Sequence, residues 1–138
     1  MKSTLSGLSV LIGRILIASI FIFSAMDKIT NFQGAVDYSH SVGIYTGLTF
    51  LLISATILEI IGAVSFILGY KIKFGAICLL IFMIPVTLLF HGFWRYTGQQ
   101  ATMQMINFMK NVCMTGGILF VLGIGAGPFS LDNACKKK

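Results

Sequence analysis

The stretch TFLLISATILEIIGAVSFILG, residues 49–69, decides the class of fold to which this chain belongs. It is long enough to cross a bilayer, because an apolar helix needs about 20 residues to do so. Glu59 is the one charged residue within it. A carboxylate at the depth of the lipid tails costs about 2.5–3.5 kcal/mol on insertion scales. Glu59 therefore needs a partner, a water-filled cavity or a proton.

Three further segments meet the same criteria of length and apolar content: residues 8–26, 74–92 and 108–126. Of the 138 residues, 57% are hydrophobic and 10% are charged, whereas a soluble domain is roughly 25% charged. Backbone polar groups in lipid must be satisfied within each span, which favours helices. We predict an all-α polytopic membrane protein, a four-helix transmembrane bundle that forms a single domain over residues 1–138.

The connections between these segments differ in length. Residues 70–73 make a tight turn, so the second and third spans should form an antiparallel hairpin. Residues 31–42, after the first span, are moderately amphipathic, with Phe32 and Val36 on one side and Gly43 placed as a C-cap. We predict a short interfacial helix at this position.

The positive charges predict the orientation of the bundle. The end that holds both termini and the tight turn carries Lys2, Lys71, Lys73, Lys136, Lys137 and Lys138. The opposite end carries Lys28, Arg95 and Lys110. Because cytoplasmic segments hold the excess of Lys and Arg, both termini should be cytoplasmic. Arg14 within the first apolar run, and the lack of a small-x-small cleavage site, argue against a cleaved signal peptide.

Composition and motifs exclude several functions. The net charge of +6 forms no dense stripe with interleaved aromatics, so we expect lipid headgroups and not nucleic acid as its partner. Cys78 and Cys113 fall near opposite ends of their spans, too far apart for a disulfide. The sequence has no histidine–carboxylate helix motif, Walker loop or dinucleotide fingerprint. We expect no metal site and no catalysis by the isolated chain.

Depth along the helices gives Glu59 a predicted partner. At 1.5 Å per residue, Arg14 lies about 9 Å and Glu59 about 15 Å inside the cytoplasmic edge. An arginine side chain can close a gap of that size, so we predict an ion pair between Arg14 and Glu59. Such a pair would be structural, and it would not exclude a functional site nearby.

A second polar group is predicted near the external side. His91 ends the third span there, Lys110 and Asn111 open the fourth span, and Lys28 closes the first. These residues should face the bundle interior. Two simpler interpretations stay open: Arg14 and Lys110 can snorkel to headgroups, and His91 can be an ordinary interfacial histidine.

The fourth span also carries a set of glycines. They are Gly116, Gly117, Gly123, Gly125 and Gly127. Small residues let helix backbones approach closely, so we expect this span to pack tightly against its neighbours.

Six short stretches resemble the DoxX family of small four-span membrane proteins, over nearly the full length of the chain. They are Gly13-Arg14-Ile15-Leu16, Ser24-Ala25-Met26-Asp27-Lys28, Glu59-Ile60-Ile61-Gly62, Phe90-His91-Gly92-Phe93-Trp94, Phe108-Met109-Lys110-Asn111 and Gly127-Pro128-Phe129-Ser130-Leu131-Asp132. Their order, with at least one stretch in every span, makes the match specific. Ala25 stands where the family usually has glycine.

The resemblance implies a four-helix bundle in the bacterial cytoplasmic (inner) membrane. It also implies a characteristic polar set that consists of Arg14, Lys28, Glu59, His91, Lys110 and Asn111. Family members are linked to thiosulfate:quinone oxidoreduction and to membrane complexes that handle oxidative and thiol stress. The resemblance thus implies a quinone as ligand and an oxidoreductase as partner, without one established activity.

Three functional hypotheses follow. The first is a membrane subunit of a redox or oxidative-stress system that binds a quinone or recruits an oxidoreductase. Glu59 or His91 would then handle a proton, while Lys110 and Asn111 would donate hydrogen bonds. The second is a proton or small-solute transporter with Arg14, Glu59 and His91 as stepping stones. The third is an assembly factor for other membrane proteins; a homo-oligomer is compatible with all three.

Overall fold

The computed structural model describes residues 2–136, with side chains from residue 4 onward. Lys137, Lys138 and the side chain of Lys2, which entered the predicted orientation, lie outside this description. The long helices are α1 (Lys2–Thr30), α3 (Leu48–Leu68), α4 (Ile72–Phe90) and α5 (Gly98–Ile124), and the short ones are α2 (Phe32–Ser41), η1 (Phe93–Arg95) and α6 (Leu131–Lys136). All four long helices are apolar and long enough to cross a membrane. The prediction of an all-α protein with four spans is confirmed.

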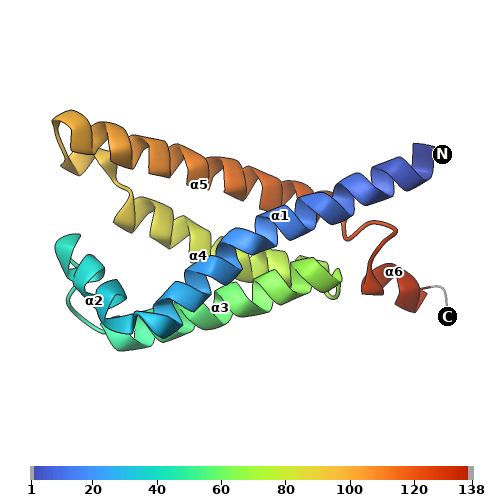
Figure 1. The fold of residues 1–138 in the computed structure, drawn as a ribbon, viewed down its shortest axis with the longest axis horizontal. Coiled ribbons are helices and arrows are strands. Elements are labelled where there is room, and N and C mark those ends of the chain that lie inside the picture. Colours follow the sequence, from blue (N-terminus) through green and yellow to red (C-terminus); the bar gives the residue numbers. More distant parts are fainter. Residues whose placement is uncertain (1, 137–138) are drawn as a thin grey trace.

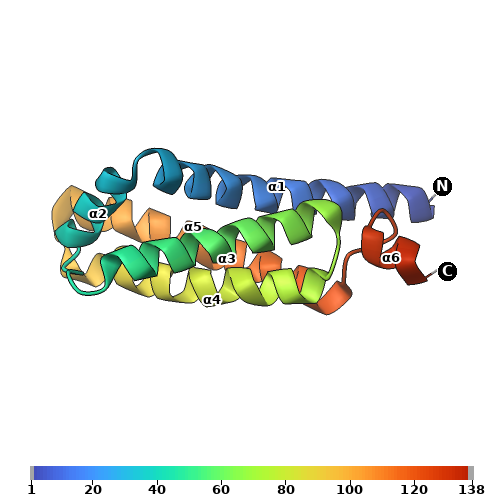
Figure 2. The same ribbon diagram turned by 90° about the horizontal axis from the view of Figure 1, so that it is seen from below.

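The four long helices run along the length of the molecule, and both ends of the described chain lie at the same end of the bundle (Figure 1). We call this the terminal end and the opposite one, which holds α2, the loop end (Figure 2). Helix α3 packs against α1 and α4, and α4 packs against α5. Helices α1 and α5 have few contacts, and they diverge toward the loop end (Figure 1). That the terminal end faces the cytoplasm stays a prediction.

The turn between α3 and α4 has the tight form expected for residues 70–73. Gly69 ends α3 with a φ of 62°, and Lys71 precedes α4 with a φ of 48°. The Ser65 hydroxyl donates to the carbonyl of Tyr70 at 2.7 Å, and the Ser65 carbonyl accepts the Tyr70 amide at 3.2 Å. One side chain near the end of α3 therefore holds the turn that reverses the chain.

The predicted short helix after the first span is α2. Its N-cap is Asn31, whose side-chain oxygen accepts the amide of Gly34 at 3.2 Å. Gly43 lies just beyond the C-cap residue, Val42, with a φ of 86°. A left-handed glycine after the C-cap is a common end for a helix. The helix lies at the loop end of the bundle (Figure 2).

The closest helix packing occurs between α3 and α4. A Cβ atom on Gly62 would lie 2.4 Å from Leu79, and one on Gly75 would lie 2.3 Å from Ser65. Only glycine allows the two backbones to approach this far. The buried core takes residues from all four long helices, and most of them belong to α3 and α4.

The prediction that the glycines of the fourth span serve mainly for packing was wrong for most of that set. Cβ atoms on Gly116, Gly123 and Gly125 would meet nothing within 4 Å. Gly117 faces Ile17 of α1, at 3.2 Å from its would-be Cβ, and Gly127 faces Val10 at 2.9 Å. The reason is that α5 packs on α4 and only briefly on α1, which leaves most of its surface uncovered by protein.

Helix α5 begins at Gly98, whereas the sequence placed the start of this span at residue 108. Glutamines at the beginning of α5 lower its hydropathy, but Gln, Ala and Met are good helix formers and extend it. Lys110 therefore lies about 18 Å along the helix from its start, close to its middle. That Lys110 and Asn111 open the membrane-embedded part of this span stays a prediction.

Candidate functional site

The buried partner of Glu59 is Lys28, not Arg14. The Lys28 ammonium lies 2.9 Å and 3.2 Å from the two carboxylate oxygens of Glu59. Glu59 is fully buried, and the side chain of Lys28 is 16% exposed. The predicted ion pair between Arg14 and Glu59 was wrong, but of the three predicted ways to accommodate Glu59 the structure shows a charged partner.

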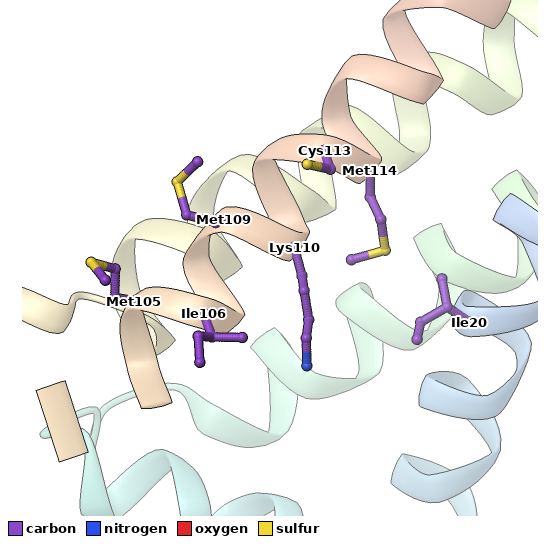
Figure 3. Close-up of a pocket in the computed structure, with 7 residues that line it drawn as sticks. All are labelled: Ile20, Met105, Ile106, Met109, Lys110, Cys113 and Met114. Carbon is purple, nitrogen blue, oxygen red and sulfur yellow. The ribbon is translucent and has the colours of Figure 1, made fainter. Parts of the chain in front are cut away.

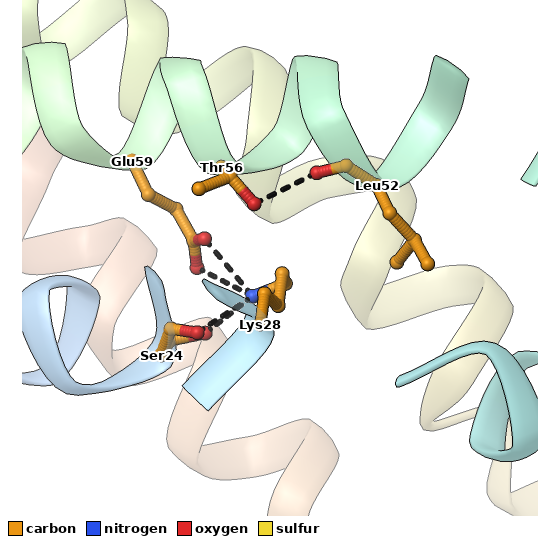
Figure 4. Close-up of polar contacts among 5 residues, drawn as sticks. All are labelled: Ser24, Lys28, Leu52, Thr56 and Glu59. Atoms are coloured by element: carbon orange, nitrogen blue, oxygen red, sulfur yellow. Dashed lines mark hydrogen bonds and ion pairs between the residues drawn. The ribbon is translucent and has the colours of Figure 1, made fainter. Parts of the chain in front are cut away.

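Lys28 reaches Glu59 because side chains in a helix lean toward its N-terminus. Its ammonium also donates to the hydroxyl of Ser24 at 2.7 Å and to the carbonyl of Ser24 at 3.2 Å, one turn back along α1 (Figure 4). The same ammonium lies 5.3 Å from the ring centre of Phe82 on α4. Three helices thus surround one ion pair, so the pair helps to set the arrangement of α1, α3 and α4.

Arg14 lies toward the terminal end, where it is fully buried. Its Nη2 donates to the carbonyl of Phe129, which follows α5. Its Nε and Nη1 have no hydrogen-bond partner among the described residues. Asp132 supplies a favourable electrostatic interaction, but it forms no ion pair with Arg14 within 4.0 Å in the described chain.

The fit of Arg14 against Gly69 gives a testable prediction. A Cβ atom on Gly69 would lie 1.8 Å from Nη1 of Arg14, and the φ of 62° is strained for other residues. Gly47 has a similar φ of 68°, but its Cβ would have open space. We expect Gly69→Ala to lower the free energy of unfolding by about 1–3 kcal/mol more than Gly47→Ala does, because only Gly69→Ala displaces a buried side chain.

Thermal unfolding of both variants in detergent or nanodiscs measures this difference. Gly47→Ala carries the strain of a left-handed alanine alone, so it is the matched control. Equal losses in the two variants would contradict the contact between Arg14 and Gly69.

The external polar group predicted from the sequence does not form one cluster. His91 Nδ1 lies 2.9 Å from the side-chain oxygen of Gln104, which joins the end of α4 to the first part of α5 near the loop end. Asn111 is buried on α5. No role was predicted for Gln104, although it lies in the polar first third of α5. The six predicted residues are therefore divided among separate places in the bundle.

Lys110 lies at a pocket between α1 and α5. The pocket has a volume of about 560 Å³ and is lined by Ile20, Met105, Ile106, Met109, Lys110, Cys113 and Met114. Ile20 of α1 lies opposite Met114 of α5, and the lysine extends outward from α5 (Figure 3). Lys110 is the one charged residue of this lining, and its ammonium has no hydrogen-bond or ion-pair partner within residues 4–136.

This pocket could not be predicted from the sequence, because it is formed by two helices that are distant in the chain. One signal was present: Met105, Met109 and Cys113 recur at the spacing of one helical face. That spacing is equally typical of a lipid-facing surface. The divergence of α1 from α5 is what makes the pocket.

The fold and the buried ion pair define a polytopic membrane protein with four helical spans. The family model for DoxX matches residues 9–92. The chain therefore belongs to the DoxX family.

Relatives in Escherichia coli (strain K12) agree with this assignment. The chain is 32% identical to inner membrane protein YphA over 123 residues, which cover 89% of this chain and 87% of the relative. It is 30% identical to inner membrane protein YqjF over 134 residues, which cover 97% of each.

A third relative matches a smaller part of the chain. The ER-derived vesicles protein ERV29 of Saccharomyces cerevisiae is 34% identical over 82 residues, which cover 59% of this chain and 26% of that protein. No solved structure matches the chain at a significant level.

Proposed function

We propose that this protein is an integral subunit of a membrane redox or oxidative-stress system and holds a quinone-like, lipid-soluble ligand in the pocket between α1 and α5. The observation that carries the proposal is Lys110, a cation near the midpoint of helix α5 without a partner in the described chain. The family resemblance supports the choice of a quinone. The proposal also retains an oxidoreductase as the partner that exchanges electrons with the ligand.

A lysine that has no acceptor within the lipid tails is costly in free energy. A lysine near the centre of a span costs about 2.5–3.5 kcal/mol on insertion scales. Glu59 and Lys28 offset the same cost for each other, but Lys110 has no such acceptor within residues 4–136. A bound molecule with an oxygen acceptor would supply one.

The lining of the pocket suits a quinone in shape and chemistry. Apart from Lys110, its lining consists of aliphatic and sulfur-containing side chains. Met105 and Met109 are exposed on the outside of the bundle, so a ligand can enter from the lipid. A quinone has a flat apolar body with carbonyl oxygens at its edge. The apolar lining suits its body, and the ammonium suits one carbonyl.

Lys110 would act as a hydrogen-bond donor to the ligand. An ammonium donates hydrogen bonds to a carbonyl oxygen, and it stabilises that oxygen further when negative charge develops on it during reduction. Glu59 is held by Lys28 and has a structural role in this proposal. His91 pairs with Gln104 away from the pocket lining, so neither residue is assigned the proton.

Photolabelling tests the proposal. Full-length protein in proteoliposomes is treated with an azido-quinone, and the labelled residues are mapped by mass spectrometry. We expect labelling on α5 around Met105–Met114 that unlabelled quinone prevents. Replacing Lys110 with methionine should lower the labelling about tenfold or more, because a hydrogen bond from a charged group is lost.

Lys73→Met is the matched control. It removes an exposed lysine from the terminal end, outside the pocket lining. Its labelling should equal that of the wild type. The proposal would be contradicted if unlabelled quinone did not prevent the labelling, or if Lys110→Met left the labelling unchanged.

A further inference from the structure

Asp132 holds the N-terminal end of α4 although it lies outside that helix. Its Oδ1 accepts the backbone amide of Lys71 at 2.8 Å, and its Oδ2 accepts that of Ile72 at 3.1 Å. The amide of Asp132 donates in turn to the carbonyl of Gly69 at 2.9 Å. Helix α4 has no acidic residue in its first turn and no side-chain cap of its own. The amides and the helix dipole at this end favour an anion, and the Asp132 carboxylate occupies that position.

Arg14 is a second and independent sign of an anion site at the same place. It is fully buried and lies against Gly69, two residues before the amide of Lys71. One of its nitrogens donates to the carbonyl of Phe129, while Nε and Nη1 have no partner among the described residues. A buried guanidinium with two unused nitrogens is expensive, because charged groups in a protein interior need acceptors. Asp132 accepts from two backbone amides and forms no ion pair with Arg14 within 4.0 Å, so it leaves the two Arg14 nitrogens unsatisfied.

The segment that carries Asp132 covers this place. We call residues 125–136 the C-terminal strap. It rests on α1 where Gly7 faces Pro128 and Phe129, with a would-be Cβ 2.6 Å and 2.9 Å away. Arg14 and the α4 amides hold the rest of it. A ligand can therefore reach Arg14 only if the strap moves.

We propose that the α4 N-terminus and Arg14 form a binding site for a phosphate group, and that Asp132 is its built-in competitor. A phosphate has more acceptor oxygens than a carboxylate and can bind arginine through two of them. It can therefore accept from the amides of Lys71 and Ile72 and also from the free nitrogens of Arg14. Binding displaces the strap from the terminal end. A phospholipid headgroup and free phosphate share this chemistry.

Binding measurements on the full chain in a neutral detergent test this site. We compare the wild type, Asp132→Asn, and Asp132→Asn combined with Arg14→Gln, using radiolabelled inorganic phosphate as the probe. Asp132→Asn should bind phosphate about tenfold more tightly than the wild type, because a tethered competitor of high effective concentration is weakened. The double variant should lose this gain.

A second measurement, with a phospholipid as the probe, distinguishes the two sources of phosphate. Native mass spectrometry measures the phosphatidylglycerol retained by the same three proteins. Retention that depends on Arg14 identifies a lipid headgroup, whereas Arg14-dependent binding of inorganic phosphate alone identifies a free anion. Equal phosphate binding by all three proteins, or binding of neither probe by Asp132→Asn, overturns the site.

A measurement on the otherwise unchanged strap keeps the test decisive if Asp132→Asn fails to fold. Cys135 is exposed on the strap and takes a nitroxide label once Cys78 and Cys113 are replaced by alanine. We expect inorganic phosphate or phosphatidylglycerol to increase the mobility of the label. Unchanged mobility with both probes overturns the displacement of the strap.

Discussion

Replacing Lys28 with methionine is expected to lower the free energy of unfolding by about 3–5 kcal/mol, the usual loss when one partner of a buried ion pair is removed. The change keeps the length of the side chain but leaves the fully buried Glu59 without its cation. It also removes the hydrogen bonds to Ser24 and the contact with the ring of Phe82. Denaturant titration in mixed micelles, followed by circular dichroism, measures the loss.

A double variant separates the ion pair from simple packing. Lys28→Met combined with Glu59→Gln removes both charges and should recover more than half of the lost stability, because no buried charge is left unpaired. Lys73→Met is the matched control at an exposed lysine, and it should change stability by about 0.5 kcal/mol or less. A Lys28→Met protein as stable as the Lys73→Met protein would show that the pair does not stabilise the bundle.

The same substitution at Lys110 is expected to have the opposite sign. Lys110→Met should raise the free energy of unfolding of the ligand-free protein by about 1–3 kcal/mol, because it removes an unpaired cation from an otherwise apolar lining. Methionine suits this position, since Met105, Met109 and Met114 already line the same pocket. The titration used for Lys28→Met provides the measurement.

A bound ligand should reduce this difference in stability between Lys110→Met and the wild type. At a quinone concentration one hundred times the dissociation constant, binding raises the free energy of unfolding by about 2.7 kcal/mol. A variant that binds quinone more weakly gains less. The wild type should therefore gain more stability on addition of quinone than Lys110→Met does. A loss of stability in ligand-free Lys110→Met would contradict the view that Lys110 lacks a partner in the folded chain.

The class of fold could be predicted from the sequence because its signals are local. Apolar runs of sufficient length give the four spans, and Gly69 with Lys71 marks the tight turn. The short helix α2 could be predicted in the same way, from its amphipathic pattern and from Gly43. In lipid, each span satisfies its own backbone hydrogen bonds, so the residues within one segment suffice to predict it.

The sequence by itself also determined that Glu59 needs a partner, a water-filled cavity or a proton, because a carboxylate at the depth of the lipid tails is costly. Only the tertiary structure decided that a cation is the partner and which cation it is. The choice of Lys28 over Arg14 depends on which faces of α1 and α3 meet, and on the direction in which a helical lysine leans. The place of Arg14 under the strap, and the pocket beside Lys110, depend on packing between segments far apart in the chain. Glu59 is therefore paired within the bundle, while Lys110 remains the unpaired charge at the pocket.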